Sequence, residues 1–469
     1  MTLATTPHTI DRATCADLDA ADPLAALRER FDLPESVVYL DGNSLGALPR
    51  TTAAHVERVI REEWGTGLIR SWNDAGWFDK PRTLGDRIAP LIGAAAGEVV
   101  LGDSTSASLF QVAMAAARLR PGRRVIVSER GSFPTDLYIL ESVQELAGAA
   151  GAPLERRLID GEDDLDAVLG DDVAVVVLTH VNYRTGRMYD LAEVTRRVHE
   201  AGALMVWDLC HSVGAVPVDL NGAGADFAIG CTYKYLNGGP GSPSFIWVAE
   251  RHQADARPAL TGWHGHARPF DFGIDYAPAE GITRFRVGTP QLLSVAGLEA
   301  SLDVWDDVDL EALREKSLRL TELFISLVDA RLGRFGVEVV TPRQSARRGS
   351  QVSLRFAGAA RTGGSAGSSA GSSAGTSAGT SAGASDDTGV AAATTPSVLP
   401  ETADGYAVMQ AIIERGVIGD FRAPDLMRFG FTPLYVTHTD VWDAVAVLED
   451  VLATESWRDE RFARRGAVT

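Results

Sequence analysis

Five short runs of apolar, largely β-branched residues recur along the middle of the chain and constrain its fold more than any other feature. They lie at residues 123–128, 173–178, 203–208, 226–231 and 244–249. The sequence DLAEVTRRVHEAGA, between the second and third runs, has the periodicity of an amphipathic helix and ends in glycine before the next run. A strand, a helix and a second strand of this kind form a βαβ unit. The sequence therefore predicts an α/β fold, with a mainly parallel sheet and helices on both faces.

The chain of 469 residues is long enough for more than one folded unit. We expect an amino-terminal segment at 1–50, a large domain at 51–310, and a smaller α/β domain at 311–469. Residues 357–403 interrupt the smaller domain and are mostly Ala, Gly, Ser and Thr, with a repeated SAGS or SAGT motif. Such small side chains bury too little apolar surface to offset the entropy of ordering, so this insertion is predicted to be disordered.

The composition argues against several classes of partner. The 44 basic and 63 acidic side chains give a net charge of −19, which repels nucleic-acid phosphates and anionic lipids. The longest apolar run, at 173–178, is too short to cross a membrane. The amino terminus lacks a basic start followed by an apolar stretch, and three cysteines are too few for a disulfide framework. We therefore expect a cytoplasmic protein that binds neither nucleic acid nor membrane.

Chemically active side chains follow two of the predicted strands. Asp208 ends one strand, with His211 three residues further on, and Lys234 comes shortly after the next strand. Ligands of such sheets bind beyond the carboxyl ends of the strands, so these side chains are expected to meet at one edge. Pyridoxal phosphate (PLP) requires a lysine amine for its Schiff base and a carboxylate that keeps its pyridine nitrogen protonated. A lysine after a strand is by itself more often a solvated surface residue, but the pairing with Asp208 favours the cofactor.

Two further segments suit the same cofactor. Ser104, Thr105 and Ser106 open a long alanine-rich helix, whose first-turn amides would face an anion such as a phosphate. Capping of the helix is the ordinary role of such residues, and both roles are compatible. Phe133 is a candidate to stack on the pyridine ring, with an ordinary core phenylalanine as the alternative.

Seven longer segments of the sequence, taken together and in order, resemble those of the kynureninase family. Its members are PLP enzymes of the class-V-aminotransferase type. The strings are YLDGNSLGALP, GLIRSWNDAGWFDKP, FPTDLYI, LTHVNYRTG, WDLCHSVGAVPVDL, GCTYKYLNGGPGS and MRFGFTPLY, and they span Tyr39 to Tyr435. The resemblance implies PLP-dependent fold type I, the aspartate-aminotransferase fold, in which the large domain has a mainly parallel sheet of the seven-stranded type. It also implies hydrolysis of L-kynurenine, and of 3-hydroxy-L-kynurenine, to anthranilate or 3-hydroxyanthranilate and L-alanine, in tryptophan degradation and NAD precursor synthesis.

The resemblance also implies roles for individual residues. Lys234 resembles the Schiff-base lysine, Asp208 resembles the partner of the pyridine nitrogen, and His211 is the neighbour of that partner. Tyr233 resembles a phosphate-contacting tyrosine and is our candidate proton relay, so Lys234, Tyr233 and Asp208 are the predicted catalytic residues. The other predicted cofactor contacts are Ser104, Thr105, Phe133, Pro134, Thr135, Asp136, Thr179, Trp263 and Thr289.

Two of these positions concern a second copy of the chain. Trp263 and Thr289 match positions through which a second subunit completes the cofactor site in the family, which implies a homodimer with shared active sites.

Arg428 resembles the arginine that binds the substrate's α-carboxylate, a task suited to its planar fork, with a surface salt bridge as the alternative. Trp72 together with Thr289 resembles the bacterial members that prefer kynurenine. The predicted substrate contacts besides Arg428 are Trp72, Asn43 and Ser44.

Other enzymes of this fold remain alternatives. A cysteine desulfurase or a small aminotransferase would share Lys234 and Asp208, but a desulfurase needs a mobile nucleophilic cysteine. The cysteines here lie in strand-associated or amino-terminal contexts, at Cys15, Cys210 and Cys231. A catalytically silent scaffold is a further alternative, although it would be expected to have lost the lysine or the aspartate.

A metal site has weak support. His264 and His266 in WHGHARP are two residues apart, and no third ligand follows at a useful spacing. We therefore predict no metal.

Overall fold

The structure is a computed structural model that describes residues 10–356 and 404–463. The predicted disordered insertion at 357–403 lies outside the described residues. The predicted domain limits at 1–50, 51–310 and 311–469 stay a prediction. None of the helices within the described ranges is long and apolar enough to span a membrane.

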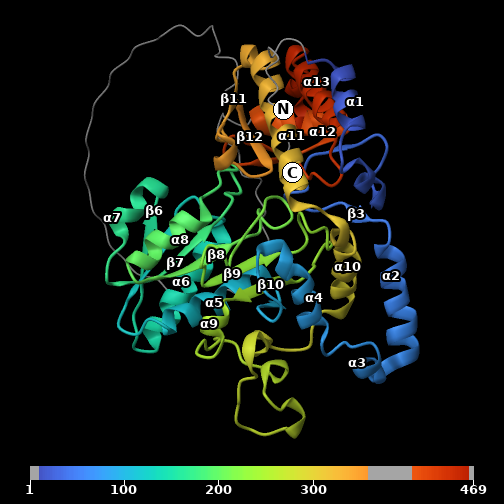
Figure 1. The fold of residues 1–469 in the computed structure, drawn as a ribbon. Helices are drawn as coiled ribbons and strands as arrows, with labels where there is room; N and C mark the ends of the chain where they lie inside the picture. The colour runs from blue at the N-terminus through green and yellow to red at the C-terminus, as the bar shows by residue number, and fades with distance from the viewer. Residues whose placement is uncertain (1–9, 357–403, 464–469) are drawn as a thin grey trace, which may run out of the picture.

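A seven-stranded sheet forms the centre of the larger part of the molecule (Figure 1), with the strand order β4-β10-β9-β8-β7-β5-β6. Its strands are β4 (Val99–Leu101), β5 (Val125–Glu129), β6 (Glu155–Ile159), β7 (Val173–Thr179), β8 (Leu204–Asp208), β9 (Phe227–Cys231) and β10 (Ser244–Val248). Every residue of β5 and of β7 to β10 is buried, as expected for strands covered on both faces. The predicted α/β class with a mainly parallel sheet is confirmed.

Strand β10 runs against the general direction of this sheet, because it pairs antiparallel with both β9 and β4. A parallel neighbour needs a crossover connection, which is usually a helix. The connection between β9 and β10, at 232–243, contains no helix and simply turns back. The glycine-rich sequence after Lys234 therefore serves as this reversing loop.

Helices cover both faces of the large sheet. Alternate residues of β5 belong to different hydrophobic clusters, with Val125 and Val127 in one cluster and Ile126 in the other. The helices of this part are α2 (Thr52–Arg58), α3 (Ser71–Asp74), α4 (Lys80–Ile88), α5 (Thr105–Arg118), α6 (Pro134–Ala149), α7 (Leu165–Val168), α8 (Leu191–Glu200), α9 (Glu250–Gln253) and α10 (Leu292–Leu302). A π-helical stretch, Val59–Gly67, continues α2.

A four-stranded antiparallel sheet lies in the upper part of Figure 1, in the order β11-β12-β15-β14. Its strands are β11 (Val337–Val339), β12 (Gln351–Phe356), β14 (Asp420–Arg422) and β15 (Leu426–Gly430), and its helices are α11 (Leu310–Arg331), α12 (Asp404–Glu414) and α13 (His438–Ala453). Two-residue strands pair β1 (Phe31–Asp32) with β3 (Leu48–Pro49) and β2 (Val38–Tyr39) with β13 (Val417–Ile418).

The amino-terminal helix α1 (Arg12–Ala20) lies beside α13, although the two are far apart in the sequence (Figure 1). Asp19 accepts hydrogen bonds from the backbone amides of His438 and Thr439, at 2.6 and 3.0 Å. These are two of the free amide groups at the start of α13, so the Asp19 carboxylate also suits the helix dipole. The contact fixes the amino-terminal segment onto the smaller sheet's helices.

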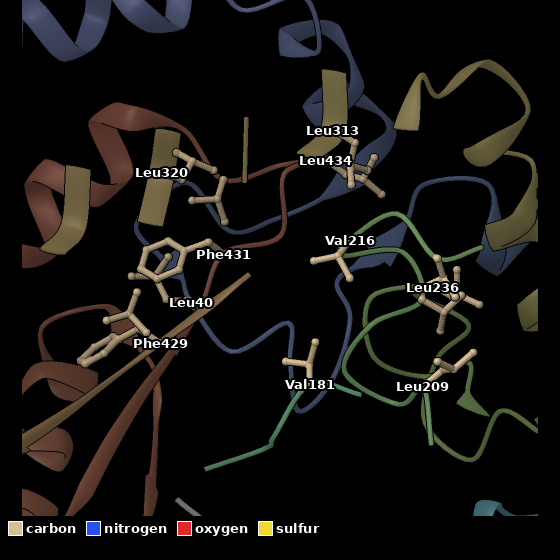
Figure 2. Packing of buried hydrophobic residues seen from close by; sticks show 14 of the residues in the cluster. Leu40, Val181, Leu209, Val216, Leu236, Leu313, Leu320, Phe429, Phe431 and Leu434 are labelled. Carbon is tan, nitrogen blue, oxygen red and sulfur yellow. The ribbon is translucent and has the colours of Figure 1, made fainter. Parts of the chain in front are cut away.

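One hydrophobic cluster joins the two sheets. Figure 2 shows members from both sides. Leu320 comes from α11, Phe429 from β15 and Phe431 from the position directly after β15, whereas Val181 and Leu209 come from the segments after β7 and β8. All of these side chains are fully buried. Because the core is continuous here, the loops at the carboxyl ends of β7 and β8 have a fixed position against β15. The candidate site lies at this junction.

Candidate active site

A cavity opens beyond the carboxyl ends of β7, β8 and β9. Its lining brings together most of the predicted cofactor contacts, and consists of Thr105, Ser106, Phe133, Thr135, Asp136, Thr179, Tyr183, Asp208, Cys210, His211, Tyr233 and Lys234. The edge of the sheet predicted from the strand ends is therefore the edge that holds the cavity.

Lys234 faces His211 across this cavity, with 2.9 Å between Nζ and Nε2. Burial, and then the charge of Lys234, hold the pKa of His211 well below its ordinary value. The imidazole is therefore neutral, and its Nε2 accepts a hydrogen bond from the lysine. The proton then resides on Nδ1, which is buried without a partner among the described residues. The lysine is thus oriented by a group that does not compete for its proton.

Two carboxyl groups flank the hydroxyl of Thr179. Its Oγ1 lies 3.3 Å from Oδ2 of Asp208 and 3.4 Å from Oδ2 of Asp136. Burial, and then the charge of Asp208, raise the pKa of Asp136 well above its ordinary value. The raised pKa favours the neutral form of Asp136. Asp208 accepts a hydrogen bond from the Cys210 amide at 2.8 Å. Two buried carboxyl groups this close together do not readily ionise at the same time.

Tyr233 comes directly before Lys234, and its ring centroid lies 5.8 Å from the lysine Nζ. The neighbouring Cys231, together with burial, raises the pKa of Tyr233 well above its ordinary value. Its hydroxyl therefore keeps its proton at neutral pH and can serve as a donor.

The residues predicted to contact the cofactor's ring and phosphate do not all line the cavity. Phe133 is 43% exposed and packs edge-to-face on Tyr183 at 5.1 Å, so the alternative of a core phenylalanine is wrong. Thr105 lines the cavity at the start of α5, whereas Ser104 is exposed and caps that helix by accepting from the Ala107 amide at 3.3 Å. Pro134 is exposed at the start of α6 and does not line the cavity. A phosphate contact by Ser104 stays a prediction.

Arg428 lies beside the cavity in β15 and is only 1% exposed, so the alternative of a surface salt bridge is wrong. Its guanidinium forms a buried ion pair with Asp420 and donates to the backbone oxygen of Tyr183 at 2.6 Å. Ser44 accepts from the same guanidinium at 3.0 Å. Asn43 donates to Gln351 at 3.1 Å, and Gln351 in turn donates to the Tyr183 oxygen at 2.9 Å. The predicted substrate contacts Asn43, Ser44 and Arg428 thus converge on the backbone of one cavity residue.

Three residues of this region have no place in the sequence-based prediction: Tyr183, Asp420 and Arg422. Tyr183 stands within the string LTHVNYRTG, and its aromatic ring was the available signal. Asp420 and Arg422 are two residues apart in β14 and therefore share a face of the sheet. That signal is weak, because charged residues at this spacing are ordinary on solvated strands.

Trp72, Trp263 and Thr289 do not line the cavity of their own chain. Trp72 and Trp263 pack together at 5.6 Å in a cluster with Phe78 and His264, and Trp263 is 37% exposed. Thr289 is exposed as well. The prediction that Trp263 and Thr289 act from a second subunit stays a prediction, and Trp72 belongs to the same surface.

The histidines of WHGHARP have other partners. His264 is buried and its Nδ1 accepts from Arg286 at 2.8 Å. Burial, and then the charge of Arg286, lower the pKa of His264 to about 3. Nδ1 of His266 accepts from the Arg268 amide at 2.9 Å. Across residues 10–356 and 404–463, no three His, Cys, Asp or Glu side chains are grouped to hold a metal ion.

Asp41, close to Asp420, makes stability depend on pH. Burial, and then the charge of Asp420, raise the pKa of Asp41 to about 7. Ionisation of Asp41 in the folded state is therefore unfavourable, and this costs the folded state stability as pH rises from about 4 to above 7. We expect Asp41→Asn, which cannot ionise, to raise the free energy of unfolding by roughly 1–3 kcal/mol more at pH 8 than at pH 5. Urea unfolding at both pH values measures this difference, and an equal effect at both would show that Asp41 is ionised throughout.

Comparison with known proteins gives matches over nearly the whole chain. Residues 38–363 match the family model for class-V aminotransferases, and residues 392–448 match the model for the kynureninase C-terminal domain. Kynureninase of Burkholderia pseudomallei strain 1106a is 51% identical over 456 residues, covering 96% of this chain and 98% of the relative. Kynureninase of Pseudomonas fluorescens is 48% identical over 462 residues, covering 98% and 99%.

Solved structures with lower identity share the fold. The cysteine desulfurase CsdA of Escherichia coli superposes with a TM-score of 0.67 at 19% identity, covering 92% of this chain and 98% of that one. C-DES, solved with glycine covalently linked to its PLP cofactor, superposes with a TM-score of 0.69 at 15% identity, covering 90% and 99%. These two structural similarities establish the fold. The family is established by the two kynureninases that are about 50% identical over nearly the whole chain. The chain therefore belongs to the kynureninase family, within the class-V aminotransferases.

Proposed function

We propose that this protein is a PLP-dependent hydrolase that converts L-kynurenine and water to anthranilate and L-alanine. The observation that carries the proposal is the contact between Lys234 and His211 beside the Asp208 carboxylate, in one cavity. In a chain of the kynureninase family, this set has the composition that PLP needs.

The residues present fit the cofactor. Lys234 supplies the amine for covalent attachment, Asp208 supplies the negative charge for the pyridine nitrogen, and Phe133 offers an exposed ring at the cavity. The first turn of the fourteen-residue helix α5, with Thr105, offers amides and a hydroxyl for the phosphate. The buried and unpartnered Nδ1 of His211 is a donor in need of an acceptor, as expected of a site that holds a further polar group.

When bound, PLP withdraws electrons from the amino acid attached to it, so bonds near the α-carbon break more easily. With the cofactor bound, Nζ of Lys234 would move the substrate's α-proton, and neutral His211 would keep Nζ oriented. Asp208 would hold the proton on the pyridine nitrogen, and Arg428 would contact the α-carboxylate. Tyr233 donates its hydroxyl proton where the alanine portion is completed, because its pKa keeps it protonated at neutral pH.

The role of Tyr233 gives a separate prediction. In Tyr233→Phe the ring and its contact with the cavity remain, whereas the transferable proton is lost. We expect normal cofactor content and a kcat lowered by about 10²-fold, since general acid–base catalysis contributes about 10²–10⁴-fold. Cofactor content is measured by absorbance and turnover by release of fluorescent anthranilate. Unimpaired turnover would assign Tyr233 to binding alone.

The substrate class is tested by comparing L-kynurenine, 3-hydroxy-L-kynurenine and L-cysteine. The proposal expects anthranilate from the first and 3-hydroxyanthranilate, at a lower rate, from the second. A cysteine desulfurase would instead release alanine from L-cysteine. All three cysteines are buried, at Cys15, Cys210 and Cys231, which disfavours a mobile nucleophile. Release of alanine from L-cysteine alone would overturn the proposal.

The remaining family properties are part of the same proposal. We infer a homodimer in which Trp263 and Thr289 of one copy reach the cavity of the other, with Trp72 close to them. The apolar surface around Trp263 supports this dimer. Phe270, Phe272 and Ile274 are 66%, 84% and 99% exposed in the single chain, and a second copy would cover them. Service in tryptophan degradation and NAD precursor synthesis, in the cytoplasm, stays a prediction.

A further inference from the structure

Arg428 has little capacity left for a substrate. A guanidinium has five N–H hydrogens. The Nε hydrogen binds Asp420 Oδ1 at 2.6 Å, the two Nη2 hydrogens bind Asp420 Oδ2 and Ser44, and one Nη1 hydrogen binds the Tyr183 oxygen. One Nη1 hydrogen remains, whereas a carboxylate held by both oxygens needs two donors. Arg428 alone therefore cannot hold a carboxylate in the bidentate manner without giving up an existing bond.

A second arginine lies on the same face of the smaller sheet. Asp420 is paired with Arg428 across β14 and β15, and Arg422 is paired with Leu426, two residues further along. Side chains two residues apart on a strand share a face, so Asp420, Arg422 and Arg428 project from one side. The Asp420 carboxylate contacts both guanidinium groups, and its Oδ2 lies 2.7 Å from Nη2 of Arg422.

Arg422 differs from Arg428 in its exposure and in its free donors. Its side chain is 32% exposed, against 2% for Arg428. Besides the ion pair with Asp420, it donates from Nη1 to the backbone oxygen of Phe421 at 3.2 Å. Its Nε has no partner among the described residues, so a fork of donors remains available to an anion that enters from solvent.

The charge of Arg422 acts on the candidate active site. After burial and Lys234, the charges of Arg428 and Arg422 also lower the pKa of His211, the partner of Lys234. The guanidinium carbon of Arg428 lies 5.9 Å from the ring centroid of Tyr183, which lines the cavity. Arg428 therefore lies beside the cavity at Tyr183, and Arg422 lies next to Arg428 on the same face of the smaller sheet, where both contact Asp420.

The positive charges of the two arginines are not fully balanced by the neighbouring carboxyl groups. Arg428 and Arg422 outweigh burial and lower the pKa of Asp420, so this carboxylate stays ionised and balances one of the two guanidinium groups. Asp41, with a pKa of about 7, is only partly ionised at neutral pH. Part of a positive charge is left over, and it would attract the carboxylate of an amino acid.

We propose that Arg422 is a substrate-binding residue, which donates to the α-carboxylate of the amino-acid substrate together with the remaining Nη1 hydrogen of Arg428. Asp420 is then the positioning residue that holds both guanidinium groups at one edge of the cavity. This inference takes the identity of the substrate from the proposed function. The class of ligand, an α-amino acid, does not depend on that function. The alternative is that Arg422 only neutralises Asp420.

The test compares two probes that differ only in the carboxylate. L-alanine and ethylamine are titrated into the PLP-loaded protein while the visible absorbance of the cofactor is followed. For Arg422→Gln we expect L-alanine to bind roughly 10- to 100-fold more weakly, as for loss of a charge-assisted hydrogen bond, and ethylamine to bind as in the wild type. With L-kynurenine, KM should rise more than kcat falls. Arg422→Lys keeps the charge but not the fork, and should lie between the two.

A matched control is Arg355→Gln in β12 of the same sheet, where Arg355 pairs with Asp425 at 2.6 Å and is 43% exposed. It should leave both titrations unchanged. Unchanged L-alanine binding in Arg422→Gln, or an equal loss for both probes, would overturn the proposal and leave Arg422 as a neutralising group. The titrations do not depend on turnover. If the wild type binds L-alanine but releases no anthranilate, the proposed function fails while this inference is still decided by the variants.

Discussion

Replacement of Lys234 by alanine is expected to abolish turnover of L-kynurenine, with kcat lowered by at least about 10³-fold. The chain has three lysines, and Lys234 is the one that lines the cavity. Lys80 is paired with Glu299 at 2.6 Å, and Lys316 is buried against Asp22 at 2.6 Å. Neither is placed to replace the amine of Lys234, so both covalent attachment of PLP and movement of the α-proton should be lost.

The measurement for Lys234 has two parts. Borohydride reduction of the PLP-loaded wild type, followed by peptide mass analysis, should place the cofactor on the peptide that contains Lys234. Turnover is then compared in Lys234→Ala and in the control Lys80→Ala, which should retain most of its activity. A label on Lys80 or Lys316, or a Lys234→Ala variant within tenfold of the wild type, would contradict the assignment.

Asp208→Asn should have the second-largest effect, with kcat lowered by about 10²–10⁴-fold. The substitution keeps the size of the side chain and its contacts with Thr179 and the Cys210 amide. It removes the negative charge that would keep the pyridine nitrogen protonated, and the electron-withdrawing power of PLP depends on that proton. Cofactor binding should be weakened much less than turnover.

Asp136→Asn is the matched control for Asp208→Asn. Asp136 lies on the other side of the Thr179 hydroxyl, and its raised pKa favours the neutral form. An amide should therefore replace it with a loss of less than about tenfold. Steady-state kinetics of the two variants, with cofactor content measured alongside, test the division of charge. Equal losses in both variants would mean that the two carboxyl groups share the charge, and would contradict the assignment to Asp208.

Features that depend on the local sequence pattern could be predicted from the sequence. The apolar runs predicted the large sheet because a strand buried on both faces must be apolar throughout, as β7 is. The strand ends predicted the site because parallel strands bring their carboxyl ends to one edge. Asp208 and Lys234 could therefore be placed together from the sequence alone.

Features that depend on contacts between distant segments could not be predicted in this way. The direction of β10 follows from the absence of a crossover helix at 232–243, and its apolar sequence is equally suited to either direction. The bonds from Arg428 to Asp420 and to the Tyr183 backbone join separate parts of the chain. Whether an arginine has free donors depends on such bonds. The sequence therefore indicated Arg428 but gave no reason to consider Arg422.

The most direct measurement of the central claim is product analysis of the PLP-loaded protein after incubation with L-kynurenine. Anthranilate and L-alanine are quantified in the same reaction, with Lys234→Ala as the parallel sample. The account predicts equal amounts of the two products from the wild type and neither from the variant. A wild-type protein that holds PLP on Lys234 but yields no anthranilate would contradict the proposed reaction, and would point to a different amino acid as the substrate of this cavity.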